Sequence, residues 1–163
     1  TADVGASHLR GWPATTEPPD ASAVEFVESM VRSRNEKVLT DSLIVCHFTY
    51  HLPLSLEQKI RLLNGASGFE YDEMSVMEFA ERVATLSRLF NYREGVTRED
   101  DILPKKFWTP QEQGPREGMK SFIDKQDFED SLDQFYDLRG WSQKGIPTKE
   151  RIHELGLSDI IKE

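Results

Sequence analysis

SVMEFAERVATLSRLFNYREG, residues 75–95, is the stretch that decides the fold. Ser75 followed by Glu78 has the spacing of a capping box, which marks a helix start. Gly95 is placed to end that helix. The stretch therefore predicts a long helix with one wide apolar face in the core. That face comprises Val76, Met77, Ala80, Val83, Ala84, Leu86, Leu89 and Phe90.

Shorter helical patterns lie on both sides of this stretch. Ser22 with Glu25 predicts a capped helix over 22–34, which Asn35 interrupts. From Glu36 the apolar pattern resumes through Tyr50, and we favour a helix over a strand there, ending before Pro53 because proline lacks a backbone donor. Ser55 with Gln58 caps a short helix that should stop near Asn64-Gly65.

The C-terminal part predicts a loop followed by two more helices. Residues 96–121 are rich in charge, proline and glycine, and are expected to form an extended loop lying on the helices. A helix carrying Phe128 and Tyr136 should stop at Gly140-Trp141, and a short helix should follow Pro147-Thr148. The expected fold is all-α, an irregular multi-helix domain with a long loop covering the helices. Residues 1–20 form a loop lead-in continuing from a missing upstream domain, and 21–163 form the helical domain.

Composition narrows the classes of partner. The 163 residues are 37% hydrophobic, enough for one packed domain, and carry a net charge of −9. An acidic chain without clustered Lys and Arg is a poor match for nucleic acid. A single cysteine excludes an internal disulfide framework, and no apolar run approaches 18 residues, so we expect a cytoplasmic protein without membrane insertion.

Few side chains suggest chemistry by themselves. Cys46 either packs as a small hydrophobe or ligates a metal or cluster whose other ligands come from elsewhere. His47 and His51 have the spacing of a helical metal face, but no third ligand accompanies them, so hydrogen-bonded or solvent-facing histidines are favoured. Asp100-Asp101 could bind a cation, but a charge cluster neutralised by the nearby Arg98, Lys105 and Lys106 is favoured.

Several strings, taken together and in order, are more specific. The chain resembles the C-terminal part of the tungsten-containing aldehyde ferredoxin oxidoreductases over nearly its whole length. The resemblance is carried by Gly5–Gly11, Asp41–Cys46, Leu62–Phe69, Arg88–Gly95, Asp100–Pro104 and Tyr136–Trp141, with Gly145–Thr148 and Leu155–Leu157 closing the chain.

The resemblance implies oxidation of an aldehyde at a tungsten held by two pterins, with electrons passing through a 4Fe-4S cluster to ferredoxin. By position, Asp41 matches a family pterin-binding carboxylate, and Cys46 matches the fourth cluster ligand. The resemblance also implies that the Val45 main chain contacts the pterin. His8 matches a family histidine that positions or protonates the substrate oxygen, and Arg10 matches a basic residue on the pterin side of the site.

This sequence departs from the family pattern at two of these places. Ile44 stands where the family usually has Gly, and Ser7 where many relatives have Cys before the histidine. The remaining cluster cysteines and the second pterin motif are absent, so the expected partners are the missing N-terminal and middle domains of the same enzyme. The isolated chain is expected to be inactive and to bind no tungsten, pterin or cluster. Two alternatives stay open: the same family acting on another substrate such as an aromatic acyl thioester, or a stand-alone helical interaction module.

Overall fold

The computed structural model describes residues 22–45, 54–115, 117–120 and 122–160. These residues form helices and connecting loops, and within them the only β-type pairings are two isolated bridges. The predicted all-α class is therefore confirmed. The α-helices are α1 (Val27–Ser42), α2 (Leu56–Ser67), α3 (Glu73–Arg93), α4 (Lys125–Arg139) and α5 (Lys149–Glu154), and the 3-10 helices are η2 (Ala23–Phe26), η4 (Arg98–Asp100) and η5 (Lys105–Trp108).

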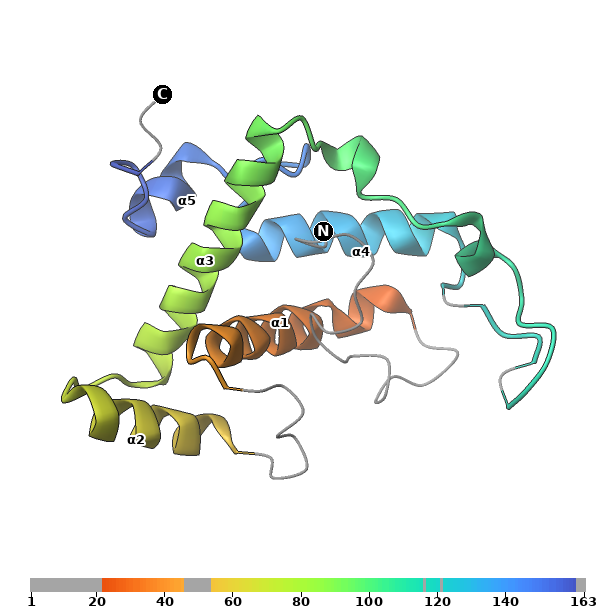
Figure 1. Cartoon of the computed structure of the whole chain (residues 1–163). Coiled ribbons are helices and arrows are strands. Elements are labelled where there is room, and N and C mark those ends of the chain that lie inside the picture. Colours follow the sequence, from red (N-terminus) through yellow and green to blue (C-terminus); the bar gives the residue numbers. More distant parts are fainter. Residues whose placement is uncertain (1–21, 46–53, 116, 121, 161–163) are drawn as a thin grey trace.

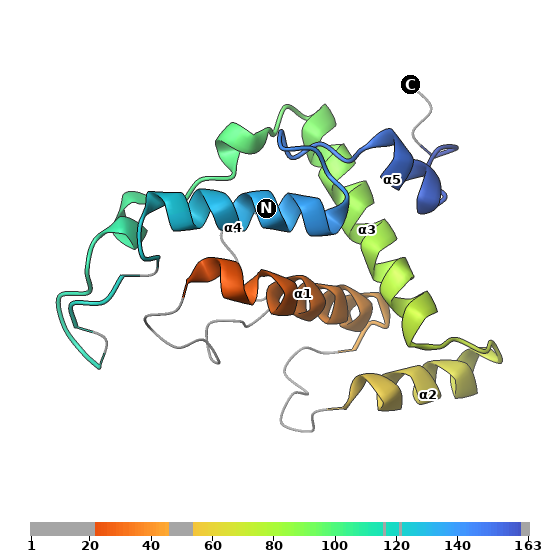
Figure 2. The same ribbon diagram turned by 180° about the vertical axis from the view of Figure 1, so that it is seen from behind.

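Helices α1 and α4 lie side by side, and α3 crosses one end of this pair, as Figures 1 and 2 show from opposite sides. Helix α2 packs near the start of α3, away from α4. Where α1 meets α4, aromatic rings pack edge to face, and burial of each large apolar side chain contributes about 1.5–3 kcal/mol. This cluster comprises Val27, Leu132, Phe135, Tyr136 and Trp141.

Helix α1 differs from the predicted pair of segments, and the helix expected from Glu36 through Tyr50 is wrong because α1 ends at Ser42. Ser22 does not cap it, because its hydroxyl donates instead to Asp127 of α4. Asn35 does not interrupt the helix. It is buried, its amide donates to Glu81 of α3 at 2.6 Å, and its oxygen accepts from Arg139 of α4 at 2.7 Å. Contacts between helices therefore override the local preferences read from the sequence.

Helix α2 begins as predicted and ends later. The capping box of Ser55 and Gln58 is present. The expected stop at Asn64-Gly65 is wrong, because the helix continues to Gly68, whose φ of 74° is the left-handed conformation that glycine accepts most easily. Asn64 instead bonds both main-chain groups of Tyr71, which fixes the turn into α3.

Helix α3 begins one turn earlier than the sequence pattern indicates. Asp72 is the N-cap, and Ser75 is its partner within the first turn. The predicted box of Ser75 with Glu78 is therefore wrong, although the helix itself is confirmed. The predicted core face is also too wide, because Leu86 and Phe90 are 39% and 54% exposed. An aspartate competes well for this position because its carboxylate accepts from the free N–H groups of the first turn.

The C-terminal helices and the long loop follow the sequence-based expectations. Gly140, with φ 68°, ends α4, and Thr148 caps α5. The loop between α3 and α4 runs beside α4 and contains η4 and η5 (Figure 1). Rings of Trp108 and Phe122 pack against Phe128 of α4 and hold the loop there. Within the described ranges, no helix combines the length and apolar character needed to cross a membrane.

We predict that Asp72→Ala lowers the melting temperature at pH 7 and that this loss shrinks at acidic pH. Bonds from the Ser75 backbone N–H and hydroxyl lower the pKa of Asp72 below its ordinary 3.8. The stabilisation that the carboxylate gives the folded state is thus complete above the pKa of Asp72 in the unfolded chain. It is lost as the pH falls through the lower pKa of the folded state. Thermal unfolding at pH 7 and pH 2.5, roughly bracketing the carboxyl range, checks this. Glu70→Ala, which removes a neighbouring exposed acid, should behave like the parent chain, and an equal Asp72→Ala loss at both pH values would contradict the role.

Candidate functional site

The end of α1 carries two of the residues that the sequence singled out, Asp41 and Val45. After Ser42 the chain reverses through Ile44, whose N–H donates to the Asp41 carbonyl at 3.1 Å. The Val45 N–H donates to the Thr40 carbonyl at 3.3 Å. This pair of bonds is the Schellman arrangement, in which the residue after the C-cap adopts the left-handed conformation.

Ile44 occupies that left-handed position. Its φ is 58°, the only positive value at a non-glycine residue in the described part of the chain. A β-branched side chain there costs about 1–2 kcal/mol, and Ile44 is 93% exposed, so little packing offsets the cost. The turn geometry is one that favours glycine, and it falls where the resembled family usually has glycine. The departure noted in the sequence is therefore a real conformational strain at the end of α1.

Asp41 is a second locally unfavourable residue at the same place. It lies in the last turn of α1, where the helix dipole disfavours negative charge. Lys37, one turn earlier, forms an ion pair with it. The Lys37 side chain is only 9% exposed, whereas that of Asp41 is 38% exposed. The carboxylate thus stays accessible from outside while its cation lies beneath it. Sequence reasoning missed Lys37, although its four-residue spacing from Asp41 was a usable signal.

This arrangement fits a ligand that donates hydrogen bonds. An ionised carboxylate only accepts, so a partly exposed Asp41 can receive N–H groups of a pterin-like ring. The Val45 N–H is already committed to Thr40, which leaves its carbonyl oxygen as the main-chain group for a ligand. Across the residues that the structure describes, no group of three or more His, Cys, Asp or Glu side chains is placed to hold a metal ion.

The other predicted site residues lie outside the described residues. These are His8, Arg10 and Cys46, together with the histidine pair His47 and His51. Their assigned roles stay predictions. The structure thus places Asp41 and Val45 on one turn.

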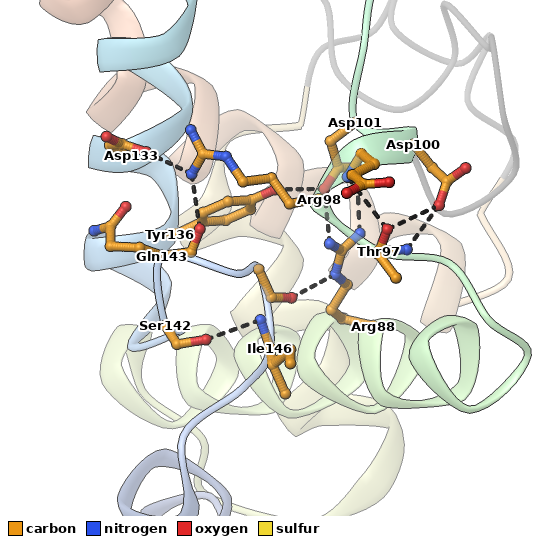
Figure 3. A network of polar contacts seen from close by, with 12 residues as sticks. Arg88, Thr97, Arg98, Asp100, Asp101, Asp133, Tyr136, Ser142, Gln143 and Ile146 are labelled. Carbon is orange, nitrogen blue, oxygen red and sulfur yellow. Dashed lines mark hydrogen bonds and ion pairs between the residues drawn. The ribbon is translucent and has the colours of Figure 1, made fainter.

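Most of the C-terminal strings that carry the resemblance meet elsewhere, in a buried polar network (Figure 3). Arg88 of α3 holds both carboxylate oxygens of Asp101, at 3.2 and 2.7 Å, and donates through Nε to the Gly145 carbonyl at 2.7 Å. The Tyr136 hydroxyl donates to the same carboxylate. Both charged side chains of the ion pair are 5% exposed. The Arg88 guanidinium also lies 5.6 Å from the centre of the Trp141 ring.

The Tyr136 phenol of this network stays protonated at neutral pH. Burial raises the pKa of Tyr136, and the hydrogen bond to the Asp101 carboxylate raises it further. The phenol therefore remains a donor at neutral pH. A buried guanidinium with a chelated carboxylate and a neutral phenol has no group ready to exchange a proton or attack a substrate. Its role is to hold α3, α4 and the two loops together.

The acidic pair Asp100-Asp101 is structural, as the favoured interpretation expected. The neutralising partner differs, because Asp101 binds Arg88 rather than Arg98, Lys105 or Lys106. Asp100 caps η4 by accepting the Thr97 N–H at 2.8 Å, and Arg98 turns to Glu129 and Asp133 on α4. The missed signal was Arg88 itself, a charged residue at the helical spacing of the buried face of α3.

We predict that Gly145→Ala destabilises the chain by about 3 kcal/mol, the sum of a left-handed φ and an overpacked core. A Cβ at Gly145 would lie 2.4 Å from Nη2 of Arg88 and 2.9 Å from the Tyr136 hydroxyl. Gly156 provides the matched control, since its φ of 63° is similar and nothing lies within 4 Å of its Cβ position. Urea unfolding should show a loss of about 1 kcal/mol for Gly156→Ala, and equal losses for the two variants would refute the packing role.

We predict that Ile44→Gly raises the unfolding free energy by about 1 kcal/mol, because glycine relieves the left-handed strain. Ile44→Ala removes the same exposed side chain but keeps a Cβ, so it should give little gain. Urea unfolding of both variants separates backbone strain from side-chain loss. A stabilisation shared equally by glycine and alanine would show that the turn is not strained.

Comparison with known proteins agrees with the sequence resemblance. A family model described as aldehyde ferredoxin oxidoreductase, domains 2 & 3, matches residues 1–157. The tungsten-containing aldehyde ferredoxin oxidoreductase of Pyrococcus furiosus is 30% identical over 154 residues, which are 93% of this chain and 24% of that protein. The corresponding Thermococcus kodakarensis protein is 29% identical over 155 residues, 94% of this chain and 24% of that protein. The chain thus spans about a quarter of the length of these relatives.

Other similar proteins have different described substrates. An aliphatic sulfonate oxidoreductase, WOR-like subunit, from Pyrococcus furiosus is 29% identical over 129 residues, 76% of this chain and 20% of that protein. Among solved structures, the active site complex BamBC of benzoyl coenzyme A reductase with 1,5-dienoyl-CoA has a TM-score of 0.61 at 27% identity, covering 82% of this chain and 20% of that one. The chain therefore belongs to the aldehyde ferredoxin oxidoreductase family and corresponds to the C-terminal domain of its tungsten-containing members.

Proposed function

We propose that this chain is the C-terminal helical part of a tungsten-pterin oxidoreductase that converts aldehydes to carboxylic acids. Electrons would leave through a 4Fe-4S cluster to ferredoxin. The family membership supports the reaction class, and the matched relatives are about four times longer, so the complete activity belongs to a larger protein. In this proposal residues 1–20 lead in from an upstream domain, and 21–163 form the helical domain.

The observation that carries the proposal is the end of α1. An acid in the last turn and a β-branched residue at a left-handed position both cost stability, and they lie three residues apart. Local rules are broken in this way chiefly where function requires it. The result is a partly exposed carboxylate beside the turn at residues 43–45. In the sequence this turn immediately precedes Cys46, which matches a cluster ligand.

Each predicted site residue has one role in this proposal. When bound, the tungsten-pterin group supplies the two-electron redox chemistry. Asp41 accepts hydrogen bonds from the pterin amino and ring N–H groups, with Val45 offering its main chain and Arg10 a positive charge. The Cys46 thiolate ligates the cluster, and His8 holds or delivers the proton of the substrate oxygen.

The outer face of α3 supports contact with further domains of the same enzyme. Phe79, Leu86 and Phe90 recur at helical spacing on the side opposite the buried residues of α3, and they are 42%, 39% and 54% exposed. A helix that is apolar on both sides is usually covered on both. We expect the upstream domains to cover this face. The proposed location is cytoplasmic, and fractionation of cells tests it.

A second candidate substrate is an aromatic acyl thioester. The similarity to the benzoyl coenzyme A reductase complex favours it specifically. Dye-linked assays of the complete enzyme with aldehydes and with aromatic acyl-CoA thioesters distinguish the two substrates. A stand-alone interaction module, the third alternative, predicts that Cys46→Ser leaves the iron-sulfur absorption of the assembled protein unchanged.

We predict that Asp41→Asn in the complete enzyme lowers the pterin and tungsten content of the purified protein about tenfold, because an amide presents N–H groups where acceptors are needed. Pterin fluorescence after oxidative release and elemental analysis measure the content. Asp101→Asn is the control, since it weakens a buried ion pair, at a cost of about 3–5 kcal/mol, away from the end of α1.

Content is compared per folded polypeptide. The Asp101 variant should melt at a lower temperature and yet keep its cofactor. Full pterin and tungsten in the Asp41 variant would contradict the proposed binding role.

A further inference from the structure

We infer that Lys37 is a positioning residue for the pterin-binding carboxylate, holding Asp41 directed outward at the end of α1. This inference rests on the proposed function. It goes beyond it by assigning a role to a residue that neither the sequence motifs nor the family resemblance singled out.

Geometry is the first support. Lys37 lies one helical turn before Asp41, and its Nζ pairs with Oδ1 of the carboxylate. The lysine side chain is 9% exposed and the aspartate side chain 38% exposed. The ammonium group therefore lies on the protein side of the carboxylate, and a ligand would approach from the solvent side.

The order of the two charges is the second support. An i,i+4 ion pair stabilises a helix more when the acid precedes the lysine than when the lysine precedes the acid. The second order complements the helix dipole less well. Here the order is reversed, and the acid lies in the last turn, where the carbonyl groups repel it. Helix stability alone therefore gives a poor reason for this pair. Ligand binding gives a better reason. If a ligand requires the carboxylate at this position, the lysine offsets the repulsion between that carboxylate and the last carbonyl groups of the helix.

Burial of the lysine is the third support. An ammonium group removed from water is costly unless a partner neutralises it. Within the described segments, Asp41 is the ion-pair partner found for Lys37. Lys37 is thus neutralised by Asp41, and the pairing restricts the rotamer of the carboxylate before any ligand arrives, which reduces the ordering cost of binding.

A neighbouring lysine provides a matched comparison. Lys59 of α2 donates to the hydroxyl of Thr40 at 3.1 Å, and so touches the same last turn of α1 from another side. Its side chain is also partly buried. Lys59→Met therefore removes a cation and a contact from this turn without removing the partner of the carboxylate.

The test uses the complete enzyme with Lys37→Met, Lys37→Arg, Lys59→Met, Asp41→Asn and the double variant Lys37→Met with Asp41→Asn. Release of pterin into buffer on mild warming is followed by fluorescence, and each melting temperature is recorded. We expect Lys37→Met to release pterin about tenfold faster, the low end of the effect of removing a group that orients a ligand residue. Lys37→Arg should restore slow release, and Lys59→Met should leave it unchanged.

The double variant separates positioning from general stability. If Lys37 acts through Asp41, Lys37→Met adds no further acceleration once Asp41 is Asn. Additive effects, or a Lys37→Met variant that melts lower but releases pterin at the parent rate, would overturn the inference while leaving the proposed function intact. Parent-like release from Asp41→Asn would instead refute the proposed function itself.

Discussion

The chelation of Asp101 by Arg88 inside the protein is the interaction on which the rest of the structure depends. It joins α3 to the start of the long loop, and through Tyr136 and Gly145 it also joins α4 and the turn before α5. A guanidinium that is 5% exposed requires this full set of partners, because any unpaired N–H would be stranded away from water. Most of the sequence segments that carry the family resemblance in this half of the chain therefore contribute residues to this one buried network.

The end of α1, in contrast, keeps two residues that are locally unfavourable. There the chain keeps an acid where the helix dipole opposes it and an isoleucine where the backbone favours glycine. The rigid arrangement of α1 with α3 and α4 holds this turn in place. Strain and exposed charge at the edge of a well-packed scaffold are typical of binding segments.

Local signals in the sequence predicted the helices well and their ends less well. Ser55, Gly140 and Thr148 act as predicted because their caps need only neighbouring residues. The predictions for Asn35 and Ser22 were wrong because their partners are distant in the chain. Asn35 bonds Glu81 and Arg139, and Ser22 bonds Asp127. For the site, Asp41 and Ile44 were found through the resemblance. Helical spacing could have pointed to Lys37 and Arg88, but the burial of Lys37 and the pairing of Arg88 with Asp101 depend on tertiary packing.

In our proposal the Asp41 carboxylate at the end of α1 faces the pterin of a complete tungsten enzyme. An experimental structure of the complete cofactor-loaded protein tests it most directly. We expect an Asp41 oxygen within about 2.7–3.2 Å of pterin nitrogen atoms, with Lys37 still paired behind it. A carboxylate covered only by protein, with the pterin bound at another face of the domain, would contradict the account.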